Sequence, residues 1–192
     1  MRELRVSPRD RIVELGCGTG RHSIAQYNHT NMIVGIDLLP PRRVAFRQPN
    51  FRYQQGDACA LPEIPDRAFD VALSFGMLEH IHPRDRLVAA IREAQRISDR
   101  YCFVVPHRYG FIEPHFLLPL FALWPEVLRS FVVRRFYQRP LARRNQFRRQ
   151  INWLSKGEWA ALFNDPNLRI LDHWYGPVLL DYLIFGGKGL AR

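Results

Sequence analysis

Three glycines alternate over residues 16–20, directly after a short apolar run at residues 11–16. Glycine has no Cβ, so a turn of this kind can bring backbone N–H groups close to a polar or anionic ligand. The apolar run is typical of a buried strand, and a weak helix is predicted from residue 21 to about residue 28. The sequence therefore predicts a ligand-binding turn between a strand and a helix.

Two aspartates close the next two strand-like segments, Asp37 after residues 32–36 and Asp57 after residues 51–56. An acid in this place, 17 residues after Gly20, can accept hydrogen bonds from a ribose diol. The turn and the acids together indicate a nucleoside cofactor. The spacing does not match the GxGxxG turn of NAD and FAD proteins, because Arg21 stands where the last glycine would fall. A P-loop is excluded, because no Gly-Lys-Ser/Thr follows.

Short strands alternate with helices along the first half of the chain, which predicts a doubly wound, Rossmann-like α/β fold with a parallel sheet in three layers. The expected parallel strands are residues 11–16, 32–36, 51–57, 69–75 and 101–105. Apolar residues at helical spacing predict an amphipathic helix over about residues 83–97. A capping box at Ser155 and Glu158 begins a helix over residues 155–163. Two closing strands, residues 168–174 and 178–185, are expected to form an antiparallel hairpin.

The composition is that of a globular protein. The chain has 192 residues, of which 47% are hydrophobic and 24% charged, so a disordered or collagen-like chain is excluded. No linker divides it, so residues 1–192 are expected to form one domain. The net charge is +10, and only Lys156 and Lys188 are lysines. The arginine excess suits an anionic partner, but it can equally reflect genome composition.

The cysteines and the apolar segments indicate in which cellular compartment the protein is expected. Cys17, Cys59 and Cys102 are odd in number and form no CxxC pair, which argues against a disulfide framework and a four-cysteine zinc site and fits a reduced cytoplasmic setting. Cys17, inside the turn, is expected to be a small packing residue. The first ten residues have no apolar core, so no signal peptide is expected. The longest uncharged apolar stretch, residues 114–125, is too short to span a bilayer.

Four segments, in order, resemble the motifs of the class I S-adenosylmethionine-dependent methyltransferases. Residues 13–20 (Val-Glu-Leu-Gly-Cys-Gly-Thr-Gly) resemble motif I, and residues 35–37 (Gly-Ile-Asp) resemble the acid of the second strand. Residues 56–62 resemble the adenine-binding turn, and residues 69–81 resemble the fourth-strand motif of the type 11, small-molecule branch. Residues 105–116 resemble a bacterial subset of that branch, associated with cell-surface glycan or lipid pathways.

The resemblance implies S-adenosyl-L-methionine as the cofactor and methyl transfer as the activity. It implies that the methionine end is held by Glu14, Gly16, Gly18 and Gly20, the ribose by Asp37, the adenine by Asp57 and Ala58, and that Ser74 flanks the methionyl group. Only ten residues precede the first strand, so the helix that often forms the lid in this family is missing. Unless the start codon is misplaced, the aromatic and basic insert at residues 110–150 is expected to cover the active site.

Two histidines are candidate catalytic bases. His80 is expected to open the helix after the fourth strand, and His107 ends the fifth. Either could take a proton from an acceptor hydroxyl, although a packing or capping role for His80 stays open. His80 and His82 together with Glu79 could suggest a metal site, but no further clear ligand accompanies them, so no metal site is expected. Further residues that could orient the substrate are Tyr109, Glu113 and His115.

The basic run from Arg129 to Arg149 has three readings: a solvated helix face, a contact with an anionic membrane, and a nucleic-acid surface. Ser74-Phe75-Gly76-Met77 replaces the Asn/Asp-Pro-Pro-Tyr signature of enzymes that methylate base amino groups. Cys102 begins its predicted strand, so no cysteine lies at a strand end suited to attack on a pyrimidine. These two absences count against a nucleic-acid substrate. The resemblance implies methyl transfer to an oxygen, ahead of a nitrogen or a carbon, of a small-molecule or lipid- or glycan-linked acceptor, in the cytoplasm or at the inner membrane surface. The alternatives are an RNA methyltransferase and a cofactor-binding protein without transferase activity.

Overall fold

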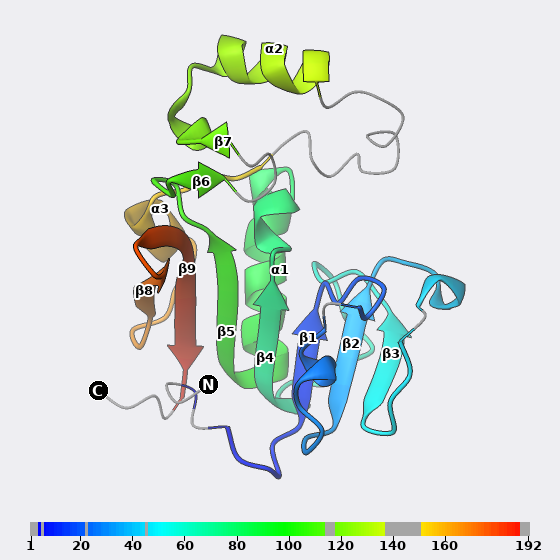
Figure 1. The fold of residues 1–192 in the computed structure, drawn as a ribbon. Coiled ribbons are helices and arrows are strands. Elements are labelled where there is room, and N and C mark those ends of the chain that lie inside the picture. The colour runs from blue at the N-terminus through cyan, green and yellow to red at the C-terminus, as the bar shows by residue number, and fades with distance from the viewer. Residues whose placement is uncertain are drawn as a thin grey trace.

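The computed structural model describes residues 4, 6–21, 23–44, 46–113, 118–136 and 151–188. Its centre is a seven-stranded sheet in the order β3-β2-β1-β4-β5-β9-β8 (Figure 1). The strands are β1 (Ile12–Leu15), β2 (Ile33–Asp37), β3 (Phe51–Gln55), β4 (Phe69–Phe75), β5 (Ser98–Pro106), β8 (Arg169–Tyr175) and β9 (Val178–Gly187). β1 to β5 are parallel, and β9 is antiparallel to both β5 and β8. The predicted parallel core with a closing antiparallel hairpin is confirmed.

One face of the sheet is covered by helices. The amphipathic helix α1 (Arg84–Ile97) buries one stripe completely, and burying each leucine or isoleucine side chain contributes about 1.5–3 kcal/mol. The short helix α3 (Lys156–Ala160) begins with the predicted capping box and adds the buried Trp159 to the same core. The stripe of α1 consists of Leu87, Ala90, Ile91, Ala94 and Ile97.

The opposite face is covered, within the described residues, by turns and by the single-turn 3-10 helix η1 (Ile24–Gln26), which buries Ala25 in the core of that face. The 3-10 helix η2 (Pro41–Arg43) is exposed, and η3 (Leu78–His80) lies between β4 and α1. The helix predicted from residue 21 to about residue 28 is wrong in length, because η1 is all the helix that the described residues of this span form. The side chain of Asn28 accepts hydrogen bonds from the backbone N–H groups of Thr30 and Asn31, which turns the chain away from a helical course.

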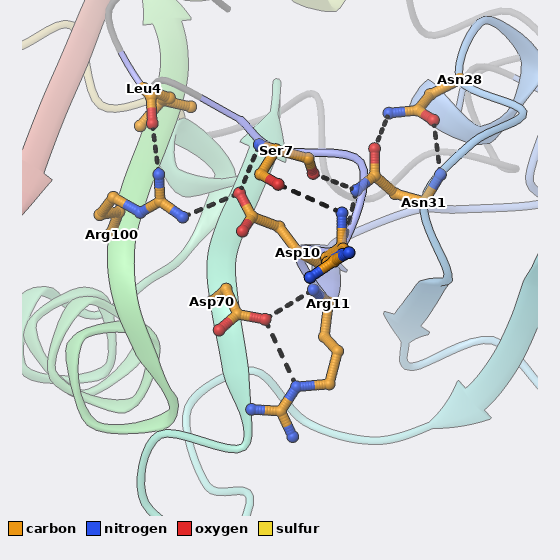
Figure 2. Close-up of polar contacts among 9 residues, drawn as sticks. Leu4, Ser7, Asp10, Arg11, Asn28, Asn31, Asp70 and Arg100 are labelled. Carbon is orange, nitrogen blue, oxygen red and sulfur yellow. Dashed lines mark hydrogen bonds and ion pairs between the residues drawn. The ribbon is translucent and has the colours of Figure 1, made fainter.

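The segment before β1 is attached to the amino end of the sheet (Figure 2). Arg100 of β5 donates to the carbonyl oxygen of Leu4 (2.6 Å) and forms an ion pair with Asp10 (2.8 Å). The side-chain amide of Asn31 donates to the carbonyl oxygens of Ser7 and Asp10. Leu4 is thereby held in the core of the second face at 1% exposure.

The region predicted as an insert lies beyond the carboxyl end of β5, where Figure 1 shows β6, β7 and α2. These elements are β6 (Ile112–Glu113), β7 (Leu118–Pro119), η4 (Phe121–Leu123) and α2 (Glu126–Phe136). They have a small apolar core of their own, centred on Phe121 and Ile151. Residues 114–117 and 137–150 of the predicted insert lie outside the described residues. No helix in the described parts of the chain is long and apolar enough to cross a membrane.

Candidate functional site

The turn after β1 has left-handed backbone at its three glycines, with φ of 76° at Gly16, 58° at Gly18 and 80° at Gly20. A Cβ on Gly16 would lie 2.7 Å from the side chain of Met77. A Cβ on Gly20 would lie 2.6 Å from that of Phe46. A Cβ on Gly18 would meet no atom within 4 Å. The turn is therefore closed at both ends and open in the middle, where a ligand can reach the main chain.

Asp37, the last residue of β2, lies against the open part of this turn. Its Oδ2 accepts a hydrogen bond from the N–H of Gly18 (2.8 Å), and its Oδ1 accepts one from the N–H of Leu39 (3.0 Å). The hydroxyl of Tyr53 on β3 donates to the carbonyl oxygen of Asp37 (3.0 Å), which holds the end of β2 in place. The structure thus brings the predicted acid and the predicted glycine turn together.

Glu14 of β1 connects the residues before the glycine turn to those after it. It is 3% exposed, and its Oε2 accepts hydrogen bonds from the hydroxyl of Ser23 (2.5 Å) and the N–H of Ile24 (3.0 Å). Burial raises the pKa of Glu14, and the two hydrogen bonds oppose that rise. These contacts join the strand before the glycines to the 3-10 helix after them, so Glu14 sets the shape of the loop between.

Cys17 packs inside the turn, as expected. Its side chain is 5% exposed and fills the space beside Gly35, where a Cβ would lie 2.7 Å from its sulfur. Burial, helped by the carboxylates of Asp37 and Glu14, raises the pKa of this thiol to about 12. Cys17 is therefore a neutral packing residue near pH 7, because the reactive form of cysteine is the thiolate.

Asp57 lies just beyond the end of β3 and is held from two sides. Its Oδ1 accepts a hydrogen bond from the N–H of Cys59 (3.0 Å), and its Oδ2 is 2.6 Å from Nη2 of Arg86 on α1. Burial acts to raise the pKa of Asp57, but the Cys59 N–H and the Arg86 guanidinium outweigh it and lower the pKa. Asp57 is thus an ionised, oriented carboxylate at the strand end next to that of Asp37.

Two further predicted cofactor contacts are buried. Ala58 is 8% exposed and belongs to the core beneath α1. Ser74 is 1% exposed near the end of β4, and its hydroxyl has no hydrogen-bond partner among the described residues. A buried polar atom of this kind is uncommon and is often satisfied by a ligand or a water molecule.

His80 lies at the end of η3 and not at the start of a longer helix, because α1 begins only at residue 84. Its side chain is 17% exposed, and Nε2 is 3.8 Å from Oε1 of the buried Glu79. The end of the insert is attached here, because Asn152 donates from its backbone to the carbonyl of Glu79 (2.8 Å) and from its side chain to that of Ile81 (2.9 Å). His80 thus lies between the two residues, Glu79 and Ile81, to which Asn152 is hydrogen-bonded.

His107 follows β5 directly and is 9% exposed. Its Nδ1 accepts a hydrogen bond from the N–H of Tyr109 (3.0 Å), so in the neutral ring Nε2 carries the proton. Nε2 is 3.4 Å from Oδ1 of Asp172, which also pairs with Lys156. Burial lowers the pKa of His107, although Asp172 acts in the opposite direction. Both ring nitrogens are therefore engaged within the chain.

The remaining predicted substrate residues are only partly described. Tyr109 is 51% exposed. The side chain of Glu113 and all of His115 lie outside the described residues. In the part of the chain that the structure covers, no three His, Cys, Asp or Glu side chains group in a way that could hold a metal ion.

Sequence reasoning missed several residues that shape the site: Ser23, Tyr53, Met77, Arg86 and Asn152. Each of these residues contacts a residue that is distant in the sequence or a backbone group. Ser23 carried a local signal, because serine favours the residue before a helix. Arg86 carried a weaker one, because the start of a helix after a parallel strand lies on the same side as the strand ends that bind ligands.

Comparisons with known proteins agree with this geometry. Residues 12–99 match a protein-family model described as a methyltransferase domain. A S-adenosylmethionine-dependent methyltransferase from Mesorhizobium loti has a TM-score of 0.64 at 15% identity, over 97% of this chain and 95% of that one. One from Methanosarcina mazei has a TM-score of 0.61 at 16% identity, over 97% and 95%. A possible histamine N-methyltransferase from Thermotoga maritima has a TM-score of 0.60 at 18% identity, over 98% and 86%. No curated protein matches the sequence of the chain.

Proposed function

We propose that this chain is a class I S-adenosylmethionine-dependent methyltransferase and that it methylates an oxygen atom of a small-molecule or lipid- or glycan-linked acceptor; the match of residues 12–99 to a methyltransferase-domain model supports the first part. The observation that supports cofactor binding most directly is the open main chain at Gly18 beside the carboxylate of Asp37. The choice of acceptor rests on the aromatic and basic residues of the segment after β5, which begins with elements beyond the carboxyl end of that strand (Figure 1).

The described residues fit the cofactor. Gly18 leaves the space that a Cβ would fill, and Asp37 offers carboxylate oxygens suited to the two ribose hydroxyls. Asp57 and the backbone of Ala58 would contact the adenine, with Arg86 keeping the Asp57 carboxylate ionised. Residues 16–20 contain no basic side chain that would repel a cation. When bound, the cofactor supplies an electrophilic methyl group on a positively charged sulfonium.

A hydroxyl acceptor must lose its proton as the new O–CH₃ bond forms and the S–CH₃ bond breaks. We assign that proton to His80, because the carboxylate of the neighbouring Glu79 can orient its ring and stabilise its charged form. His107, the other candidate, has both ring nitrogens engaged by Tyr109 and Asp172, and we infer that it mainly positions the end of β5. Positioning the acceptor supplies most of the remaining rate enhancement.

The proposed acceptor reaches the site from the side of the insert. The chain carries a net charge of +10, and no acidic residue lies between Glu126 and Glu158, a stretch that holds eight arginines. This charge supports a peripheral contact of the basic run from Arg129 to Arg149 with an anionic membrane at the cytoplasmic surface, next to a lipid-linked acceptor.

The cofactor part is tested by thermal melts with S-adenosylmethionine, S-adenosylhomocysteine, NAD and ATP. A ligand at 100 times its Kd stabilises the folded state by about 2.7 kcal/mol, which such a melt resolves easily. We expect stabilisation by the first two compounds only. Stabilisation by NAD alone would overturn the proposed cofactor site.

The acceptor part is tested with cofactor that carries a tritiated methyl group and with separated lipid, glycan and RNA fractions. We expect label in the lipid or glycan fraction that resists mild alkali if it is an ether and is released if it is an ester. Nuclease-sensitive label would instead establish the RNA alternative. Stabilisation by the cofactor with no label in any fraction would favour a binding protein without transferase activity.

The base is tested with the fraction that accepts label. Replacing His80 by asparagine should lower kcat by about 10²-fold or more and remove the rise of kcat with pH near neutrality. Replacing His107 by asparagine should change kcat far less. Equal losses in both variants, with unchanged pH profiles, would contradict the assignment.

A further inference from the structure

Helix α2 is apolar on two opposite sides. On the inner side, Val132 and Val133 pack against the small core of the insert. Arg129 also belongs to this side, because its guanidinium lies over the ring of Trp153 at 5.0 Å and donates to the carbonyl of Ala122 (2.9 Å). The inner side of α2 is therefore accounted for by packing within the chain.

The outer side carries large apolar side chains in solvent. Val127 is 83% exposed, Leu128 45% and Phe131 59%, and their spacing places them on one face of a helix with 3.6 residues per turn. We call these three residues the outer face of α2. Leu120 and Leu123, just before the helix, are also exposed, at 40% and 47%. Single exposed apolar residues are ordinary, but a cluster of this kind typically marks an interaction site.

Positive charge borders the outer face. Arg134 and Arg135, both exposed, follow Phe131 at a spacing that places them on either side of it. Glu126 is the helix's only acid, and the same spacing places it well away from the outer face. Arginines in a last turn also interact favourably with the helix dipole, but this interaction does not explain why the neighbouring face is apolar.

We propose that the outer face of α2 docks on an anionic lipid bilayer, with its apolar side chains among the acyl chains at the headgroup boundary and Arg134 and Arg135 at the lipid phosphates. Charge complementarity favours this occupant over a second copy of the chain, because two copies would bring like-charged arginines together. The inference deepens the proposed function, on which its link to a lipid-linked acceptor rests.

The docking surface is connected to the candidate site. The inner side of α2 contacts Trp153, and the adjacent Asn152 is hydrogen-bonded to the carbonyls of Glu79 and Ile81 around η3. A bilayer on the outer face would therefore lie beyond the carboxyl end of the sheet, on the side from which the proposed acceptor approaches (Figure 1).

Co-sedimentation of the full chain with vesicles tests the inference. One set of vesicles is pure phosphatidylcholine, and the other contains about a third phosphatidylglycerol, a density of negative charge that attracts basic segments. The apolar variant is Val127→Gln with Phe131→Gln, and the charge variant is Arg134→Gln with Arg135→Gln. Tyr175→Gln, at a side chain that is 76% exposed in the β8–β9 hairpin, is the matched control. Glutamine is a good helix former, so α2 is expected to persist in the variants.

We expect the unmodified chain and the control to sediment with anionic vesicles only, and less so at high salt. Binding should fall about tenfold or more in the apolar variant and about fivefold for each arginine removed. Unchanged binding in the apolar variant would overturn the inference. A dimer in solution that the apolar variant dissociates would overturn it too, because the outer face would then pair two copies. The inference would also be overturned if the unmodified chain bound RNA but not vesicles, and if only the charge variant lost that RNA binding.

The same samples separate this inference from the proposed function. Stabilisation by S-adenosylhomocysteine should be equal in the unmodified chain and in all three variants, because none of the altered residues lies in the candidate site. Loss of vesicle binding with retained stabilisation concerns only the docking surface. Vesicle binding without stabilisation in the unmodified chain would contradict the cofactor site and leave the docking surface supported.

Discussion

Replacing Gly18 by alanine separates the ligand role of the glycine turn from its conformational role. Gly18 has φ of 58°, and a Cβ there would meet no atom within 4 Å. The variant should therefore be destabilised only by placing alanine in a left-handed backbone conformation, which lowers the free energy of unfolding by about 1–2 kcal/mol. Gly176, in the turn between β8 and β9, also has φ of 58° and open space around its Cβ position. Gly176→Ala therefore carries the same conformational cost and is a matched control.

The two variants should lose the same stability and differ in ligand binding. One kcal/mol shifts Tm by about 2–4 °C in a chain of this size, so both should melt about 2–8 °C lower without ligand. S-adenosylhomocysteine at 100 times its Kd should add about 2.7 kcal/mol to the unmodified chain and to Gly176→Ala. In Gly18→Ala the new methyl group would occupy the space proposed for the ligand, so this gain should largely disappear.

The measurement is a thermal melt with and without S-adenosylhomocysteine, supported by calorimetric titration of both variants. If Gly18→Ala keeps the ligand-induced shift of Gly176→Ala, the open space above Gly18 is not the ligand space and the reasoning is refuted. If Gly18→Ala melts far below Gly176→Ala without ligand, the turn contains steric contacts that the structure does not show.

Three further outcomes are expected. Asp37→Ala should leave the fold intact but abolish stabilisation by S-adenosylhomocysteine, and a retained Kd in calorimetry would contradict the ribose contact. Arg86→Met should lower the free energy of unfolding, measured with denaturant, by no more than about 1 kcal/mol, because the ion pair of Arg86 with Asp57 is partly exposed. A loss of stability that does not change with salt concentration would contradict this explanation. Because burial lowers the pKa of His107, the unfolded chain takes up its proton first as pH falls, so stability should decline below about pH 6.5. His107→Asn should reduce that decline in pH-dependent unfolding, and an unchanged slope would place its origin elsewhere.

The sequence alone was enough to predict the features that depend on local pattern. The apolar runs and the glycine turn placed β1 to β4, and the helical spacing from Leu87 to Ile97 placed α1. The capping box at Ser155 was also correct, because both its hydrogen bonds form within four residues. The resemblance of these segments to a methyltransferase agrees with the family match of residues 12–99.

Other features were decided only when distant segments came together. Arg86 meets Asp57 across 29 positions, and Asn152 meets Ile81 across 71, so no local pattern could predict either contact. The same is true of Nε2 of His107, which meets Asp172 of β8, whereas its Nδ1 is engaged locally by the N–H of Tyr109. Strand register and crossover direction determine which side chains meet at the carboxyl end of the sheet, and these depend on packing of the whole chain. The sequence therefore predicted which groups would bind the proposed cofactor, and the tertiary structure decided which contacts those groups make within the chain.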